Sequence, residues 1–89
     1  MIPWQLKEIA RCESTNRHYE STGEVIRGKV NPQDVGTYQI NLKYHQAKAE
    51  SMGLDLLDKE DNETYALYLY ETQGAQPWSA SNPCHHLLD

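Results

Sequence analysis

Phenylalanine is absent from this chain, and its aromatic content consists of six tyrosines and two tryptophans. A tyrosine combines apolar area with a polar tip, so it suits the wall of a sugar-binding groove as well as half-buried packing. We expect packing for most of the six. Low-complexity runs and internal repeats are absent too, which favours an ordinary globular domain.

Positive charge is scarce: eight lysines and arginines, scattered along the chain, stand against 13 acidic residues, and the net charge is −5. Nucleic-acid binding needs a basic stripe, so the composition argues against it. No apolar run reaches the length of a membrane span. The first residues, Met1–Glu8, lack both a basic segment and a long apolar one. No signal peptide is visible, so we expect either a removed export signal or another route out of the cell.

Cysteine is limited to Cys12 and Cys84, and a Cys-x-x-Cys pair is missing. That absence argues against a redox or zinc motif. At the chain end, Cys84 is followed directly by His85 and His86, a spacing that does not suit zinc ligands. We therefore interpret this end as a surface tail and expect neither a metal nor another cofactor.

A chain of 89 residues should form one domain, spanning 1–89, with a modest core. Apolar spacing and capping residues predict three helices, over Trp4–Ser14, Leu42–Met52 and 59–73. Ser21-Thr-Gly23 predicts a turn in a short hairpin. Asn62, on the apolar side of the third helix, is interpreted as a helix-start residue. We expect Ala75–Asp89 to be irregular, with Pro77-Trp78 folding back over the core.

The most informative stretch is Ile9-Ala-Arg-Cys-Glu13-Ser14 at the end of the first predicted helix. Glu13 follows Leu6, Ile9 and Ala10 at spacings of seven, four and three, so it shares their inward-facing side. Desolvation there disfavours a charged carboxylate and raises its pKa. Such a group can hold a proton near neutral pH and deliver it, as a general acid must. The alternative is a partly exposed glutamate at a helix end.

A second stretch, Asn31–Asn41, contains Gly36-Thr-Tyr-Gln39-Ile-Asn41. Its apolar residues mix the spacings of helix and strand. Gly36 marks either a positive φ or a close approach of the backbone to a ligand.

Together, Glu13-Ser14 and Gly36-x-x-Gln-Ile-Asn41 resemble the lysozyme-like superfamily, above all the soluble-lytic-transglycosylase (SLT) type of domain, a relative of goose-type lysozymes. The likeness covers nearly the whole chain, since it continues through Asn62-x-x-Tyr65-Ala66, Gly74-x-x-Pro77-Trp78 and Ser81-x-x-Cys84. It implies a mainly α fold of the lysozyme-like α+β kind, in minimal form. A short β-hairpin or loop region would lie beside the active-site cleft.

The resemblance also implies an activity: cleavage of peptidoglycan glycan strands between N-acetylmuramic acid and N-acetylglucosamine. The enzyme would be a monomer acting in the cell envelope, outside the cell or after delivery by a phage. Glu13 would be the catalytic acid, with Gly36 close to the glycan. The expected substrate-binding residues are Ser14, Gln39, Asn41 and Tyr65.

A disulfide between Cys12 and Cys84 is a further implication of the resemblance. Such a bridge would close a loop of about 70 residues and stabilise the fold by about 4 kcal/mol. For a domain of this size, that is a large share of the total stability.

Glycoside hydrolysis conventionally needs a second carboxylate, and Glu20, Glu24 and Asp34 are candidates without a compelling context. The lack of a clear second carboxylate is compatible with a lytic transglycosylase. In that family the substrate's own N-acetyl group is thought to assist, and the ionised glutamate then takes the muramic 6-hydroxyl proton to give a 1,6-anhydro product. A muramidase of the same fold stays open.

A lysozyme-like wall-binding or virion structural module that does not cleave stays open as well. Two departures from the family pattern favour it. Glu63 stands where many relatives have a branched apolar residue, and His85-His86 stands where a tryptophan is expected.

Overall fold

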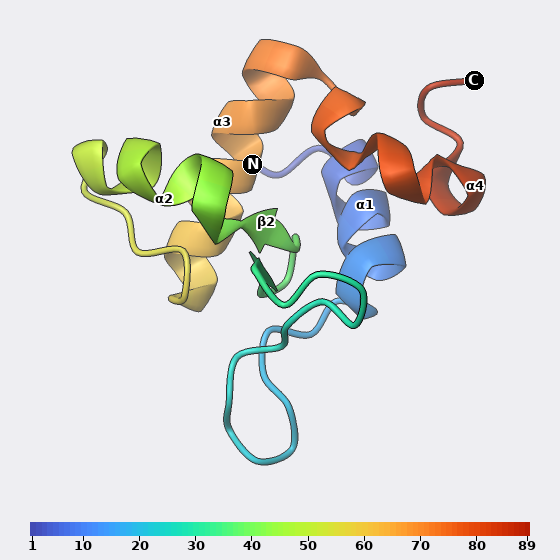
Figure 1. Ribbon diagram of the computed structural model, residues 1–89. Coiled ribbons are helices and arrows are strands. Elements are labelled where there is room, and N and C mark those ends of the chain that lie inside the picture. The colour runs from blue at the N-terminus through green and yellow to red at the C-terminus, as the bar shows by residue number, and fades with distance from the viewer.

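Helix α1 (Trp4–Ser14) buries Leu6, Ile9 and Ala10 in the core and carries Glu13 in its last turn. The computed structural model describes residues 1–89, and Figure 1 shows α1 beside the helical segments that close the chain. The helix ends because Thr15 and Asn16 adopt left-handed backbone conformations, with φ of 55° and 61°. The predicted first helix is therefore confirmed.

The other two long helices are α2 (Leu42–Ser51) and α3 (Lys59–Gln73). Each begins at a capping side chain: Asn41 accepts a hydrogen bond from the backbone N–H of Tyr44, and Asp58 accepts one from that of Asp61. The sequence predicted both helices to within one residue.

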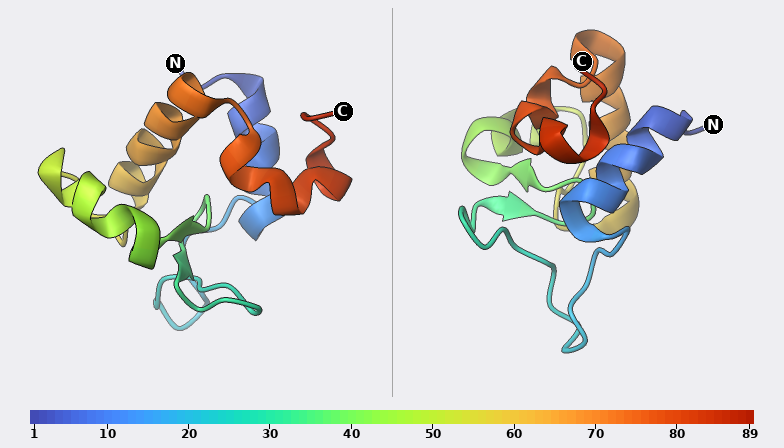
Figure 2. Two further views of the ribbon diagram at one scale, coloured as in Figure 1. Left: turned by 45° about the horizontal axis from the view of Figure 1, so that its top comes forward. Right: turned by 90° about the vertical axis from the view of Figure 1, so that its right-hand side faces the viewer.

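Between α1 and α2 lies a two-stranded antiparallel sheet, β1 (Asp34–Val35) with β2 (Ile40–Asn41). The fold is thus mainly α with a small β-hairpin, as the sequence predicted. The predicted turn at Ser21–Gly23 also forms, with Gly23 at φ 90°. The predicted hairpin around it is limited to a single β-bridge between Tyr19 and Val25. Figures 1 and 2 show this segment as a long loop that extends away from the helices.

The C-terminal segment is more regular than predicted. It forms a 3₁₀ helix, η1 (Gln76–Ser81), followed by the short helix α4 (Asn82–His85). Each has a proline in its first turn, where the missing N–H costs no hydrogen bond. The prediction of irregular structure in this segment was therefore wrong. The predicted return over the core is confirmed, because buried Trp78 donates its indole N–H to the carbonyl of Tyr38 at 2.9 Å.

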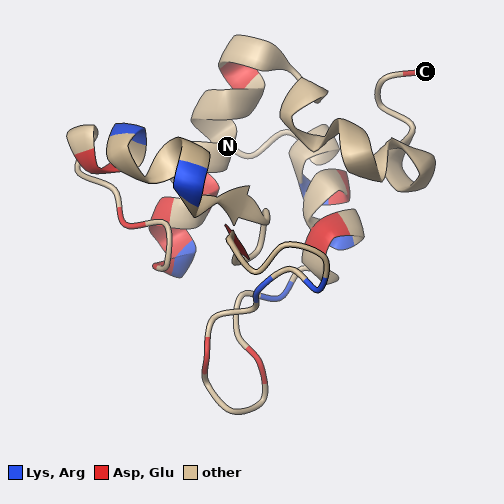
Figure 3. Cartoon of the chain, in the orientation of Figure 1, with Lys and Arg blue, Asp and Glu red and all other residues tan.

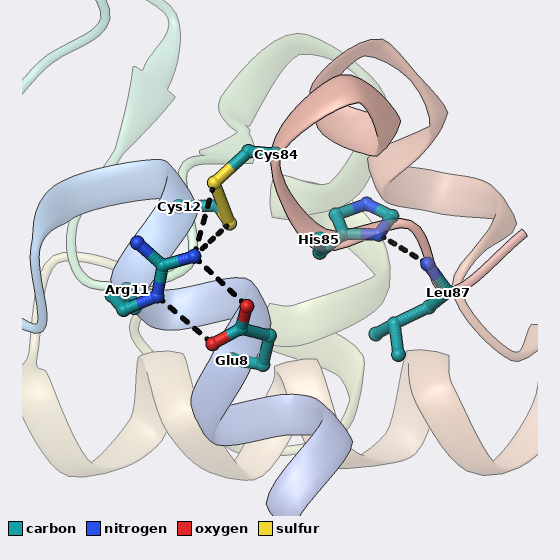
Figure 4. Close-up of polar contacts among 6 residues, drawn as sticks. All are labelled: Glu8, Arg11, Cys12, Cys84, His85 and Leu87. Carbon is teal, nitrogen blue, oxygen red and sulfur yellow. Dashed lines mark hydrogen bonds and ion pairs between the residues drawn. A yellow bond between two sulfur atoms is a disulfide. The ribbon is translucent and has the colours of Figure 1, made fainter.

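A disulfide joins Cys12 on α1 to Cys84 on α4, across 72 residues of sequence and a Cα–Cα distance of 5.9 Å. The expected bridge is present. Figure 4 shows it beside the ion pair of Arg11 with Glu8, in which the guanidinium and carboxylate lie 2.9 Å apart. The bridge fixes the C-terminal segment against the turn of α1 that carries Glu13.

One hydrophobic core holds these elements together. No helix is both long and apolar enough to cross a bilayer. The buried residues of the core come from every element except α4, and they are Leu6, Ile9, Ala10, Val35, Tyr38, Ile40, Ala49, Leu56, Tyr65, Ala66, Leu69, Ala75 and Trp78.

Asn62 and Gly36 form a polar junction inside this core. The Asn62 side chain is fully buried, accepts from the N–H of Tyr38 and donates to the carbonyls of Val35 and Leu56. Asn62 lies in the first turn of α3, as interpreted, but its side chain does more than start the helix, because it joins three segments. Gly36 has φ 78°, and a Cβ there would lie 2.5 Å from the ring of His18. Its close approach is to buried protein side chains, which corrects the expected approach to a glycan.

Candidate functional site

Glu13 is half-buried at the end of α1, and its Oε2 accepts a 2.6 Å hydrogen bond from Oγ of Ser81. Burial raises the pKa of the Glu13 carboxyl above its ordinary value, and the negative charge of Asp34 raises it further. The Ser81 hydrogen bond and the nearby His85 lower this pKa, but burial has the largest effect. Glu13 is therefore suited to hold and deliver a proton.

A cleft of about 130 Å³ opens beside Glu13. Its apolar lining residues come from α3, η1 and β2, and carboxylate, amide and imidazole groups line it as well. Its lining residues are Glu13, Asp34, Gln39, Ile40, Asn41, His45, Leu69, Pro77, Trp78 and Ala80. The cleft alone is smaller than a typical ligand pocket.

Two further hollows adjoin the cleft, and all three have Glu13 and Gln39 in their walls. One runs under the loop that carries Lys29 and Val30, and the other follows the end of α1 past Ser14 and Arg17. All three hollows meet at Glu13 and Gln39, and we name them together the groove. An extended ligand could place a bond in its middle at the carboxyl group.

Gln39 faces this groove from a strained position, with φ 50°. Its Nε2 donates to the carbonyl of Gly36 at 3.0 Å, which fixes the amide, while its Oε1 receives no hydrogen bond from the protein. A fixed acceptor beside Glu13 can take a hydrogen bond from a ligand hydroxyl or amide. The structure thus brings these two predicted site residues together.

Ser14 and Asn41 have structural contacts as well as positions at the groove. Ser14 is buried, donates from Oγ to the carbonyl of Thr37 at 2.7 Å and accepts from the N–H of Arg17. Asn41 caps α2 and donates from Nδ2 to Oδ1 of Asp34 at 2.9 Å. Both therefore fix the local geometry of groups that line the groove.

Tyr65 lies behind the cleft and does not line it. Its ring is 1% exposed, and its hydroxyl lies 2.9 Å from Nδ1 of His45, which does line the cleft. Burial lowers the pKa of His45, so this imidazole is neutral near pH 7 and can offer one donor or one acceptor. Sequence reasoning missed His45. The helical pattern places it near the start of α2, but only the tertiary fold brings it to Tyr65.

Among the candidates for a second carboxylate, only Asp34 shares the cleft with Glu13. Glu20 lines the hollow that follows the end of α1, and Glu24 lines a separate depression on the loop. The strand pairing of Asp34 with Asn41 explains this position, since it sets Asp34 at the edge of β1 facing the cleft.

The histidines do not form a surface tail. His85 is buried, donates from Nε2 to the carbonyl of Trp78 at 2.9 Å and accepts from the N–H of Leu87, whereas His86 is exposed. His18 is buried too, between Thr37 and the carbonyl of Leu57. Both buried rings hold backbone segments in place, and no cluster of three or more metal-ligating side chains occurs.

In comparisons with protein families, with curated proteins and with solved structures, nothing matches this chain.

Proposed function

We propose that this protein cleaves the glycan strands of peptidoglycan between N-acetylmuramic acid and N-acetylglucosamine, as a lytic transglycosylase with Glu13 as its single acid–base group. The observation that carries the proposal is the position of Glu13: a half-buried carboxyl with a raised pKa, which lines the cleft and both adjoining hollows. The sequence resemblance to SLT-type domains, through Glu13-Ser14 and Gly36-x-x-Gln39-Ile-Asn41, supplies the substrate.

In the proposed reaction, the Glu13 carboxyl donates its proton to the glycosidic oxygen as the bond from that oxygen to C1 breaks. The resemblance assigns stabilisation of the positive centre to the substrate's own N-acetyl group. Ionised Glu13 then takes the proton of the muramic 6-hydroxyl group, and the oxygen of that hydroxyl group forms the bond to C1. The product is a 1,6-anhydro sugar, and Glu13 ends protonated, ready for another cycle.

The same group must act first as acid and then as base, which needs a pKa between those of a free carboxyl and a fully buried one. Burial raises the pKa of Glu13, and the hydrogen bond from Ser81 limits the rise. These opposed effects support a single-carboxyl mechanism.

A muramidase of the same fold is the second candidate, and Asp34 is the observation that favours it. Asp34 lines the cleft with Glu13 and is held by Asn41, so it could orient a water or stabilise a positive centre. Hydrolysis would leave a reducing sugar instead of an anhydro one.

Digestion of purified sacculi, followed by mass spectrometry of the released products, tests these alternatives. Anhydro-muropeptides are expected, reducing muropeptides would assign a muramidase, and binding without release would assign a wall-binding module. Glu13→Gln should lower cleavage at least about a hundredfold, because general acid catalysis contributes about 10²–10⁴-fold. Glu71→Gln, an exposed carboxylate on α3, is the matched control.

Asp34→Asn separates the two enzymatic mechanisms. A transglycosylase that relies on Glu13 alone should keep most of its activity and its anhydro product. A hydrolase that uses Asp34 should lose cleavage to about the extent of Glu13→Gln.

A further inference from the structure

The hollow that follows the end of α1 has a basic wall. Arg17, Arg27 and Lys29 line this space of about 260 Å³, and Glu13 and Gln39 line it too. A ligand that lies in the cleft beside Trp78 and continues past Glu13 therefore reaches these three cations. We name this part of the groove the basic arm.

The cations of the basic arm are not neutralised by the protein. The only ion pairs are those of Arg11 with Glu8 and of His86 with Asp89. Arg17 donates from Nε to the hydroxyl of Thr15, and Arg27 donates from Nη1 to the carbonyl of Pro32, each at 3.1 Å. These contacts orient both guanidinium groups while leaving their charges unpaired.

The basic arm contrasts with the charge of the whole chain. The net charge is −5, yet the arm gathers three of the eight lysines and arginines against one carboxylate, Glu20, besides Glu13 itself. Figure 3 shows basic positions collected where the loop passes the end of α1. The net negative charge of the chain repels an anionic ligand, whereas the three cations of the basic arm attract one locally.

We infer that the basic arm binds a carboxylate-bearing substituent of the ligand in the groove. This inference rests on the proposed function. On a peptidoglycan strand, the carboxylate belongs to the lactyl group of N-acetylmuramic acid or to the stem peptide attached to it. Guanidinium groups suit this chemistry, because their paired N–H donors match the two oxygens of a carboxylate. The arm would make the groove selective for muramic-acid strands over uncharged N-acetylglucosamine strands.

Binding by the wild-type chain tests the selectivity. The probes are N-acetylmuramic acid, a free stem tripeptide and N-acetylglucosamine, each titrated at low salt and followed by amide NMR signals. We expect at least one acidic probe to bind more tightly than N-acetylglucosamine, to shift the signals of Arg17, Arg27 and Lys29, and to weaken with added salt. The tighter of the two acidic probes identifies which carboxylate is recognised. Equal affinity for all three probes would overturn the inference.

The double variant Arg27→Gln/Lys29→Gln tests the residues. Affinity for the acidic probe should fall about three- to tenfold, in line with exposed charge pairs, while affinity for N-acetylglucosamine stays unchanged. The control Lys43→Gln/Lys48→Gln removes the same charge from α2, outside the groove. An equal fall in the control would mean that net charge alone matters, and the inference would fail.

Digestion of sacculi is measured separately, so the two proposals can fail independently. If no glycan is cleaved but the acidic probe still binds at the arm, the inference stands and the cleavage function fails. If sacculi are cleaved equally by wild type and the double variant, and uncharged chitin oligosaccharides are cleaved as readily, the cleavage function stands and the inference fails.

Discussion

Ser81, near the end of the chain, donates a hydrogen bond of 2.6 Å from its Oγ to Oε2 of Glu13, near the beginning. Ser81 ends η1, directly before α4, and the disulfide from Cys84 holds α4 against α1. The protonation of Glu13 therefore depends on a segment 68 residues away in the sequence. This relationship leads to the first prediction.

Ser81→Ala should raise the pKa of Glu13. The hydrogen bond from Ser81 stabilises the ionised carboxylate and lowers its pKa. Without this hydrogen bond, burial and the negative charge of Asp34 raise the pKa further. NMR titration of the labelled carboxyl carbon should show a higher midpoint, and the limb of kcat/KM that falls as Glu13 ionises should move to higher pH. Ser79→Ala, an exposed serine of η1, is the control and should change neither. A lower midpoint for Ser81→Ala would contradict the prediction.

Glu13→Gln should stabilise the protein at neutral pH. The folded-state pKa of Glu13 is raised, so the protonated carboxyl favours folding. That contribution is complete below the unfolded-state pKa and is lost as the pH rises through the folded-state value. The amide of the glutamine variant stays neutral at every pH, so the variant does not lose this stability. The melting temperature of the variant should exceed that of wild type near pH 7, and the difference should shrink toward about pH 4. A variant less stable than wild type at every pH would show that the carboxyl is not desolvated.

Local sequence signals were sufficient for the three long helices. Their starts and ends depend on side chains within a few residues, such as the cap Asp58 and the stop at Gly74, so spacing and capping rules find them. The partial burial of Glu13 was predicted in the same way, because its distance from the apolar positions of α1 is fixed by the helix itself. Gln39 was predicted as a site residue only from the resemblance, and the structure places it beside Glu13 in the lining of the cleft.

Contacts between distant segments were not predictable from such signals. His45 meets Tyr65 only because the fold brings these parts of α2 and α3 together, and Asp34 is placed by its pairing with Asn41. Glu63, which stands where the domains that the sequence resembles often have an apolar residue, accepts a 3.0 Å hydrogen bond from the hydroxyl of Tyr38. A polar residue on an apolar helix face is explained by a partner that only the folded chain supplies.

Gly36→Ala should destabilise the fold far more than Gly23→Ala. Both glycines have positive φ, 78° and 90°, so both substitutions incur the left-handed strain of about 1–2 kcal/mol. At Gly36 the new Cβ would also lie 2.5 Å from the buried ring of His18, whereas nothing lies within 4 Å at Gly23. Overpacking adds about 1–3 kcal/mol, so the total at Gly36 should reach about 3 kcal/mol or more. Urea denaturation of both variants measures the difference, and equal losses would mean that the junction of His18 with Asn62 is loosely packed.

Cys12→Ser/Cys84→Ser should lower the free energy of unfolding by about 2–5 kcal/mol, as expected for removal of a native disulfide from a small domain. Denaturant unfolding measures this loss, and intact mass with alkylation before and after reduction verifies the bridge in the wild-type protein. Because the same segment carries Ser81, loosening it should also weaken the hydrogen bond to Glu13. The variant should therefore shift the Glu13 titration in the same direction as Ser81→Ala, under conditions where its helical circular dichroism is unchanged. Free alkylation of both thiols in the native protein would exclude the bridge, and an unshifted titration would show that Ser81 keeps its position without it.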